Sequence, residues 1–374
     1  MTTRKDIENA LMRGADTLRD TIDAANYKDY VLPIMFVKYL SDSYEDALDK
    51  LKKQYSGIRL ERQKRYLPFT VAEDCSFQSL YKQRFADNIG QLINAAMRQI
   101  EADNNQQLAG VLSAVDYNSE NALGTREHKN AILRDLLEDF EPLNLRPSMI
   151  EVKEGQVPAD VIGDAYEYMI GQFASMAGKK AGSFYTPAAV SEIMARIVNV
   201  QPGERVYDPT CGSGSLLIKA AKKQNSKEVS IFGQEVNGSS VAMAKMNMYI
   251  HEIRDAMIGW GDTLANPVFL DSDGNLLLFD AIVANMPFSL RLVSLKKPPA
   301  TFLFTGAKSS ASMMTMPFQS PKYRYFILAP CHTPMTINVI TLAMQPGSTL
   351  LICAPNLGFS HLPKFRKRFE IESG

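Results

Sequence analysis

The first segment that could carry chemistry is a glycine-rich turn, which reads Asp208-Pro209-Thr210-Cys211-Gly212-Ser213-Gly214-Ser215. Its glycines let the backbone turn tightly into a helix and approach a ligand closely. It is not a Walker phosphate loop, because no Lys-Ser/Thr pair follows the glycines. It is also a poor dinucleotide fingerprint, since Leu217 stands where the third glycine belongs. A ligand-binding turn and a purely structural turn both remain open.

Two carboxylates follow at the ends of later apolar runs. Glu235 comes 21 residues after Gly214, and an acid at that spacing can accept both hydroxyl protons of a ribose. Asp262 follows Gly261, and its carboxylate can accept from an exocyclic amine such as the amino group of adenine. A solvated acid explains Glu235 equally well, and a helix N-cap explains Asp262 equally well.

A fourth signal is the tetrapeptide Asn285-Met286-Pro287-Phe288. The amide oxygen of Asn285 can accept a hydrogen bond from an amino group, which favours a pyramidal nitrogen with a localised electron pair. Phe288 offers an aromatic face to a base rotated out of a duplex. The alternative is an Asx-Pro turn followed by a core phenylalanine.

The last signal precedes the others in the chain, and it reads Ser183-Phe184-Tyr185-Thr186-Pro187. Its aromatic faces suit a sulfonium cation, and its hydroxyl groups can form hydrogen bonds. A loop with core aromatics is the alternative for this segment alone. All five signals occur in one order, and together they predict a single site.

The elements that must position this site alternate between strand and helix. Short apolar strands are predicted at 205–207, 229–233, 257–261 and 279–284, with helices at 190–198, 216–223 and 241–250. This rhythm predicts an α/β fold with a doubly wound parallel sheet. Ligands bind at the carboxyl ends of such strands, and the site residues follow those ends.

The preceding part of the chain is predicted to be helical. The run Val31–Leu40 is apolar on nearly all sides, which predicts a buried helix with Pro33 in its first turn. Further helices are predicted at 44–55, 88–101, 131–140 and 161–174, with a polar loop at 103–107. The prediction is therefore a helical N-terminal domain over 1–175 and a catalytic domain over 176–374, incomplete or altered after about residue 290.

Composition narrows the class of protein. The 374 residues are 45% hydrophobic and 22% charged, with 41 basic and 41 acidic side chains, which is typical of globular proteins. The absence of a long apolar run argues against a membrane span. The N-terminus lacks an apolar signal core, and the four cysteines form no CxxC pair, so a reducing cytoplasm is expected. The four histidines are scattered, so no metal site is expected, and His251 is expected on a helix surface.

At these residues the chain resembles the amino-methyltransferases that act on adenine in DNA. Leu18-Arg19-Asp20 and the segment Tyr30–Asp42 resemble the N-terminal domain of the modification subunit of type I restriction-modification systems. The resemblance covers about residues 5–290. It implies a Rossmann-like sheet of the S-adenosylmethionine-dependent methyltransferase type. It also implies N6 of adenine as the methyl acceptor, together with DNA, a specificity subunit, a second modification subunit and a restriction subunit as partners.

The resemblance also assigns roles to residues. Ser183, Phe184, Tyr185, Thr186 and Pro187 would line the cofactor, while Asp208, Gly212, Ser213 and Gly214 would surround its methionine portion. Glu235 would hold the ribose, Asp262 the adenine, and Asn285, Pro287 and Phe288 the target base. One departure is Met286, where the family has proline; the loop loses stiffness there, so a slower reaction is expected.

The chain changes character after Leu290. Residues 1–290 hold 31 basic and 39 acidic side chains, whereas 291–374 hold 10 basic and 2 acidic ones and 9 of the 19 prolines. We hypothesise that much of 291–345 is translated out of frame, because shifted codons restore family-like residues. A basic segment that contacts DNA phosphates is the alternative. A strand is predicted at 348–354 and a basic helix at 364–368, and the C-terminal region of longer family members is expected to be missing.

Other classes of protein compete with this interpretation. A nicotinamide oxidoreductase would need the third glycine and gives no reason for the Asn-x-Pro-Phe motif. A degenerate or truncated paralogue would bind cofactor or partners without methylating, and Met286 and the altered tail keep that alternative open.

Overall fold

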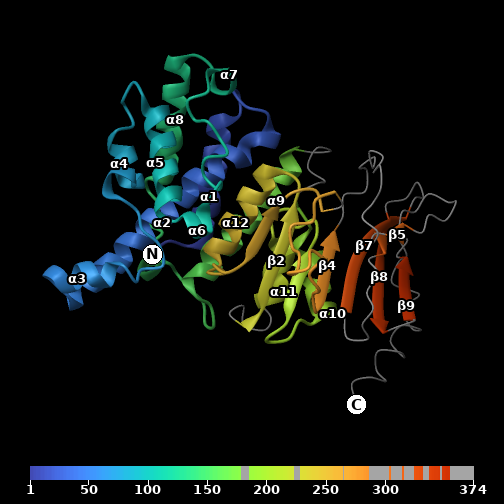
Figure 1. Ribbon diagram of the computed structural model, residues 1–374. Coiled ribbons are helices and arrows are strands. Elements are labelled where there is room, and N and C mark those ends of the chain that lie inside the picture. Colours follow the sequence, from blue (N-terminus) through green and yellow to red (C-terminus); the bar gives the residue numbers. More distant parts are fainter. Residues whose placement is uncertain are drawn as a thin grey trace.

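The computed structural model describes residues 1–177, 185–222, 228–263 and 265–285, together with strand segments at 303–304, 314–315, 324–331, 337–345 and 348–353. A helical region and a seven-stranded sheet lie side by side, with α12 (Gly238–Ile250) between them (Figure 1). None of the helices in these residues is both long and apolar enough to cross a membrane.

Amphipathic helices build the N-terminal region. α1 (Arg4–Leu18) begins after Thr3, which forms a capping box with Asp6, and its apolar face is fully buried. The polar loop predicted at 103–107 instead contains the short helix α6. The other helices of this region are α2 (Tyr27–Gln54), α3 (Gly57–Lys64), α4 (Phe77–Lys82), α5 (Ile89–Asp103), α6 (Asn105–Leu108), α7 (Glu120–Leu123), α8 (Arg126–Phe140) and α9 (Pro158–Ala177), with single 3-10 turns η1 (Ala24–Asn26), η2 (Glu73–Cys75) and η3 (Pro147–Met149).

The long helix α2 corrects one sequence prediction. The apolar run and the charged stretch at 44–55 form one helix of 28 residues that begins at Tyr27. Pro33 therefore lies inside the helix and not in its first turn. Proline removes one backbone donor from a helix interior, and packing on all sides of this buried segment offsets that cost: Val31, Ile34, Phe36 and Leu40 are at most 1% exposed.

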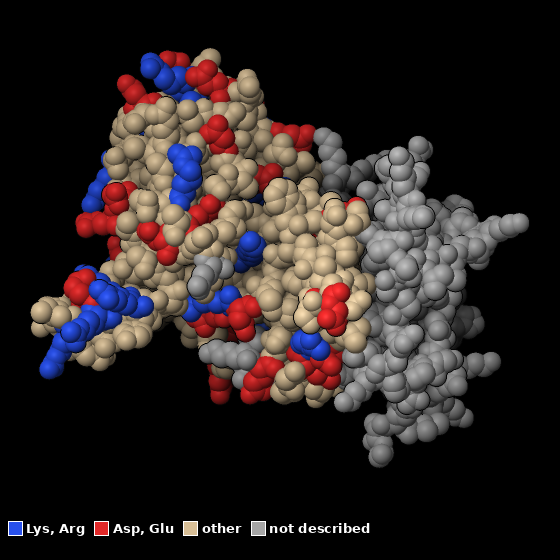
Figure 2. Space-filling model, in the orientation of Figure 1, with Lys and Arg blue, Asp and Glu red and all other residues tan. Residues whose placement is uncertain are grey.

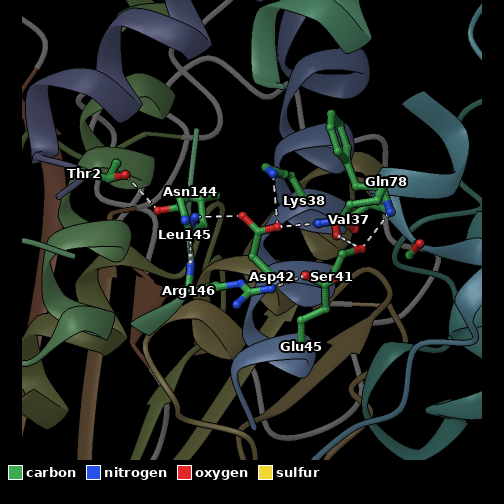
Figure 3. A network of polar contacts seen from close by, with 12 residues as sticks. Thr2, Val37, Lys38, Ser41, Asp42, Glu45, Gln78, Asn144, Leu145 and Arg146 are labelled. Carbon is green, nitrogen blue, oxygen red and sulfur yellow. Dashed lines mark hydrogen bonds and ion pairs between the residues drawn. The ribbon is translucent and has the colours of Figure 1, made fainter. Parts of the chain in front are cut away.

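A buried carboxylate ties α2 to its neighbours (Figure 3). Asp42 is 2% exposed and accepts hydrogen bonds from Lys38 Nζ at 3.0 Å, Gln78 Nε2 at 2.7 Å and the Leu145 amide at 2.7 Å. Burial raises the pKa of Asp42, and the charge of Lys38 opposes that shift. The ion pair with Lys38 is matched by further hydrogen bonds, as a buried charge requires.

The sheet has the order β3-β2-β1-β4-β7-β8-β9. The strands β1 to β4 and β7 are parallel, and β8 and β9 complete the sheet through antiparallel pairs. The predicted α/β sheet is confirmed. Its strands are β1 (Arg205–Asp208), β2 (Ser230–Glu235), β3 (Met257–Trp260), β4 (Ala281–Asn285), β7 (Arg324–Cys331), β8 (Ile337–Gln345) and β9 (Ser348–Cys353); β5 (Leu303–Phe304) and β6 (Met314–Thr315) form a separate pair.

Sequence reasoning found β9 but not β7 and β8, which lie in the segment hypothesised to be out of frame. The intervening residues of 291–345 and the basic helix predicted at 364–368 lie outside the described part. The reading-frame hypothesis therefore stays a prediction.

Alternate residues of the central strands face two different cores. Val206, Ile231 and Val283 pack against α10 (Ala188–Val198), α11 (Ser215–Lys222) and α12. Tyr207, Phe232 and Ile282 join Phe279 on the opposite face. The other side of α12 enters the core of the N-terminal helices through Met243, Met246, Tyr249 and Ile250, so α12 couples the helical region to the sheet.

Candidate active site

The carboxyl ends of four parallel strands meet at one edge of the sheet. Asp208 on β1 lies opposite Gly233, and Glu235 on β2 lies opposite Trp260. β4 pairs with the other side of β1 and ends at Asn285. The chain order reverses beside β1, and in open α/β sheets ligands bind at such a switch point.

The glycine-rich turn wraps around the end of β2. Gly212 and Gly214 have φ values of 52° and 76°, which side chains rarely allow. The Gly212 amide donates to Glu235 Oε2 at 3.0 Å. The Ser213 carbonyl accepts from Asn247 Nδ2 at 3.0 Å, so α12 fixes the turn from behind.

Glu235 is held by backbone amides on both of its oxygens. Besides Gly212, the Asn237 amide donates to its Oε1 at 2.9 Å. Burial raises the pKa of Glu235, and the hydrogen bonds from Asn237 and Gly212 oppose that shift. Each carboxylate oxygen has a second lone pair, so the side chain can still accept hydroxyl protons.

Asp208 is more deeply buried, at 2% exposure, and has fewer partners. The Thr210 amide donates to its Oδ1 at 2.9 Å. Burial raises its pKa to about 7, against the hydrogen bond from Thr210, and the charge of Glu235 raises it further. Neither acid forms an ion pair with a lysine or arginine in the described part of the chain. A cationic ligand would supply the missing charge, which fits the sulfonium and ammonium groups of S-adenosylmethionine.

Asp262 begins the turn after β3. Its Oδ1 accepts from the Ala265 amide at 3.2 Å, and its carbonyl accepts from the Asn266 amide at 2.7 Å. Beside it, Thr263 donates its hydroxyl to the Pro209 carbonyl at 2.6 Å. Asp262 therefore caps a turn and not a helix, since no helix begins at this position in the described residues, and Thr263 joins this turn to the glycine-rich turn.

Gln234 is a fully buried side chain that sequence reasoning missed. Its Nε2 donates to the carbonyls of Asn266 at 2.9 Å and Gly261 at 3.2 Å, and its Oε1 accepts from the Val268 amide at 3.1 Å. Gln234 therefore holds the turn that carries Asp262 against the end of β2. A polar residue inside an otherwise apolar strand was the available signal.

Asn285 is paired with the loop that precedes the sheet. Its Nδ2 donates to Thr186 Oγ1 at 3.1 Å, which leaves its Oδ1 directed away from that contact. The ring of Tyr185 packs on Gly171 of α9, where an added Cβ would lie 2.9 Å from Tyr185 Cζ. Pro187 lies directly before α10.

Four predicted site residues, Ser183, Phe184, Pro287 and Phe288, lie outside the described residues, as does Met286.

The structure corrects the expectation that His251 lies on a helix surface. It is 5% exposed and ends α12 against Gly163 of α9, where no side chain would fit. Burial lowers its pKa well below the usual range. Glu167 lies near His251, and its Oε2 is 3.2 Å from Lys219 Nζ. His251 is buried despite its polarity, because the neighbouring apolar residues of α12 are buried with it. No metal-binding cluster occurs among the described residues.

Two family models match the chain. The HsdM N-terminal domain matches residues 7–140, and N-6 DNA Methylase matches residues 157–316. The type I restriction enzyme MpnII methylase subunit of Mycoplasma pneumoniae is 29% identical, over 95% of this chain and 68% of that protein. The MjaVIII methylase subunit of Methanocaldococcus jannaschii is 30% identical, over 75% of this chain and 47% of that protein.

A crystal structure of a type I restriction-modification system methyltransferase subunit from Streptococcus thermophilus has a similar fold. It has a TM-score of 0.61 and 29% identity, over 77% of this chain and 64% of that chain. The strand order and the acids at the sheet edge define a Rossmann-like fold of the S-adenosylmethionine-dependent methyltransferase type. The chain thus matches an HsdM N-terminal domain followed by an N-6 DNA Methylase domain. It spans roughly half to two thirds of the length of these relatives.

Proposed function

We propose that the chain is the methyltransferase subunit of a type I restriction-modification system. It transfers a methyl group from S-adenosylmethionine to N6 of adenine in DNA. The observation that carries this proposal is the meeting of a glycine-rich turn, an asparagine amide and two buried acids at one edge of the sheet. Neither acid is paired with a cation among the residues that the structure describes. The family match supports the substrate, and the names of the similar subunits support the system.

Different residues of the site hold different parts of the cofactor. Glu235 holds the ribose hydroxyls, and Asp262 holds the adenine. Asp208 and the turn at 212–214 face the methionine portion, and residues 183–187 line the cofactor. When bound, S-adenosylmethionine would supply a methyl group on its sulfonium sulfur. As the adenine nitrogen bonds to that methyl, the S–CH3 bond would break, the sulfur would leave as the neutral thioether, and the surplus proton of the nitrogen would pass to solvent. Deep burial of Asp208 strengthens its attraction to positive charge, because few water molecules screen it.

Asn285 prepares the acceptor nitrogen. Its amide oxygen accepts a hydrogen bond from the adenine amino group, which localises the lone pair of that nitrogen. The contact with Thr186 occupies the amide nitrogen, and this orientation keeps the oxygen available to the base. Pro287 and Phe288 are proposed to stiffen the loop and to stack on the everted base.

The partners and the division of the chain are part of the same proposal. A specificity subunit reads the DNA sequence, a second modification subunit completes the methyltransferase, and a restriction subunit joins for cleavage, all in the cytoplasm. The helical domain spans 1–175 and the catalytic domain 176–374.

The test is methyl transfer by the full chain with its cognate specificity subunit, followed with tritiated S-adenosylmethionine and cognate duplex. Asn285→Ala is expected to abolish transfer but retain cofactor binding, whereas Asp208→Ala is expected to abolish binding. Asp273→Ala, in an exposed turn, is the matched control and should keep both. Cofactor binding without transfer by the unaltered chain would instead identify a degenerate paralogue. Full transfer by Asn285→Ala would refute the catalytic assignment.

A further inference from the structure

One exposed segment carries a charge opposite to that of its surroundings. Residues 50–65, here called the basic arm, comprise the end of α2, the link to α3, α3 itself and Arg65. They hold seven basic side chains and one acidic one, Glu61. The rest of residues 1–290 holds 24 basic and 38 acidic side chains. The arm is therefore a concentrated positive surface on a strongly acidic body, and its Lys and Arg side chains cover α3 in Figure 2.

The arm projects from the body of the protein (Figure 1). α3 has no buried residue, so apolar packing does not explain its sequence. A helix of eight residues is marginal by itself, and like charges within it weaken it further. Because the basic side chains of the arm add little to the stability of the fold, we attribute them to binding a partner.

Local acids neutralise only part of the arm. Lys50 pairs with Asp46 at 2.8 Å, Lys64 with Glu61 at 2.7 Å and Lys52 with Asp49 at 4.0 Å. Four other basic side chains form no ion pair with any residue that the structure describes: Lys53, Arg59, Arg62 and Arg65. Three of the four are arginines, whose planar guanidinium groups match phosphate oxygens.

We propose that the basic arm binds the phosphate backbone of duplex DNA outside the methylation site. This inference rests on the proposed function, which brings DNA to the protein. The acidic remainder of residues 1–290 repels a polyanion, so the arm supplies the attraction that the body lacks. An acidic protein surface is the competing occupant, and the test separates the two.

The fold places the arm at a defined distance from the site. The first turn of α2 contacts the start of α12 beside the sheet edge, where Lys28 Nζ lies 3.0 Å from Ser239 Oγ. α2 has 28 residues, and at about 1.5 Å per residue it spans about 40 Å. α2 also contacts the far end of α12, where Phe36 packs against Tyr249, so α2 leads away from the sheet edge and the arm contacts phosphates remote from the target base.

The test measures binding of the full chain to a fluorescent 30-base-pair duplex of random sequence, without cofactor, between 50 and 200 mM KCl. The variant is Arg59→Glu/Arg62→Glu/Arg65→Glu. We expect an affinity loss of about 30-fold or more, and a slope of log K against log salt that is less steep by about 2 to 3, because each phosphate contact contributes about 0.9. Replacement of the same arginines by Gln should reduce the slope equally with a smaller affinity loss.

The matched control reverses three exposed charges on other helices, in Lys82→Glu/Arg98→Glu/Arg126→Glu, and should leave the slope unchanged. Three results would overturn the proposal: no binding by the unaltered chain, an unchanged slope in the arm variant, or an equal loss in the control. Loss of self-association without loss of DNA binding would assign the arm to an acidic protein surface. Because no methyl transfer is measured, these results are independent of the cofactor and transfer tests.

Discussion

Two buried carboxylates, both 2% exposed, play opposite parts in this protein. Asp42 in the helical region has a cation, a side-chain amide and a backbone amide around it (Figure 3). Asp208 at the sheet edge has only Thr210 and lies near a second acid. The fold satisfies the first carboxylate from within, whereas the second lacks a cation in the described structure. Equal burial therefore does not mean equal surroundings, and the partners distinguish the acid that the fold satisfies from the acid that we propose binds a ligand.

The largest expected effect is on the satisfied acid. Lys38→Met removes the cation but leaves Asp42 buried, so we expect unfolding to become easier by about 3–5 kcal/mol. Urea denaturation measures this free energy of unfolding. The control is Lys64→Met, which breaks a solvent-exposed pair with Glu61 and should cost at most about 1 kcal/mol. Similar losses in both variants would remove the distinction between Asp42 and an ordinary surface acid.

The next effect concerns pH and the unsatisfied acid. Burial raises the pKa of Asp208 from 3.8 to about 7, so its protonated form is favoured in the folded state. The resulting stability is fully present below about pH 4 and is lost as the pH rises through 7. Without cofactor, Asp208→Asn should therefore gain roughly 2–4 kcal/mol relative to the unaltered chain between pH 4 and pH 8. If the thermal stability of the two proteins depends on pH in the same way, the pKa of Asp208 is not raised in the folded state.

A smaller effect is expected at the asparagine. Thr186→Val removes the acceptor for Asn285 Nδ2, so the amide loses its fixed orientation. We expect kcat for methyl transfer to fall about tenfold, corresponding to one lost hydrogen bond, with cofactor affinity unchanged. Thr186→Ser restores the hydroxyl and should restore the rate. An unchanged kcat in Thr186→Val, or no recovery in Thr186→Ser, would show that Thr186 does not orient Asn285.

The sequence was most informative where one residue type fits one local position. Acids and an amide after short apolar runs, combined with strand-helix alternation, predicted the sheet edge and the residues that lie there. The same local reasoning failed at Pro33 and His251, because tertiary packing determines whether a proline interrupts a helix and whether a histidine is buried.

Contacts between distant segments were beyond this reasoning. Gln234 clamps a turn about 30 residues away, Asn247 supports the glycine-rich turn, and Thr186 meets an amide 99 residues later. None of these side chains has a local pattern that names its partner. The sequence therefore predicts which residues lie at the sheet edge better than it predicts which residues hold them in place.

We propose above all that Asp208, the buried acid at the sheet edge, interacts with the positive charge of a bound ligand. Titration calorimetry of S-adenosylmethionine at pH 7, in buffers of different ionisation enthalpy, measures the protons released on binding. Since Asp208 is about half protonated there, the account predicts release of roughly half a proton for each cofactor bound by the unaltered chain. Binding without proton release at this pH, or no binding to the unaltered chain, would contradict it.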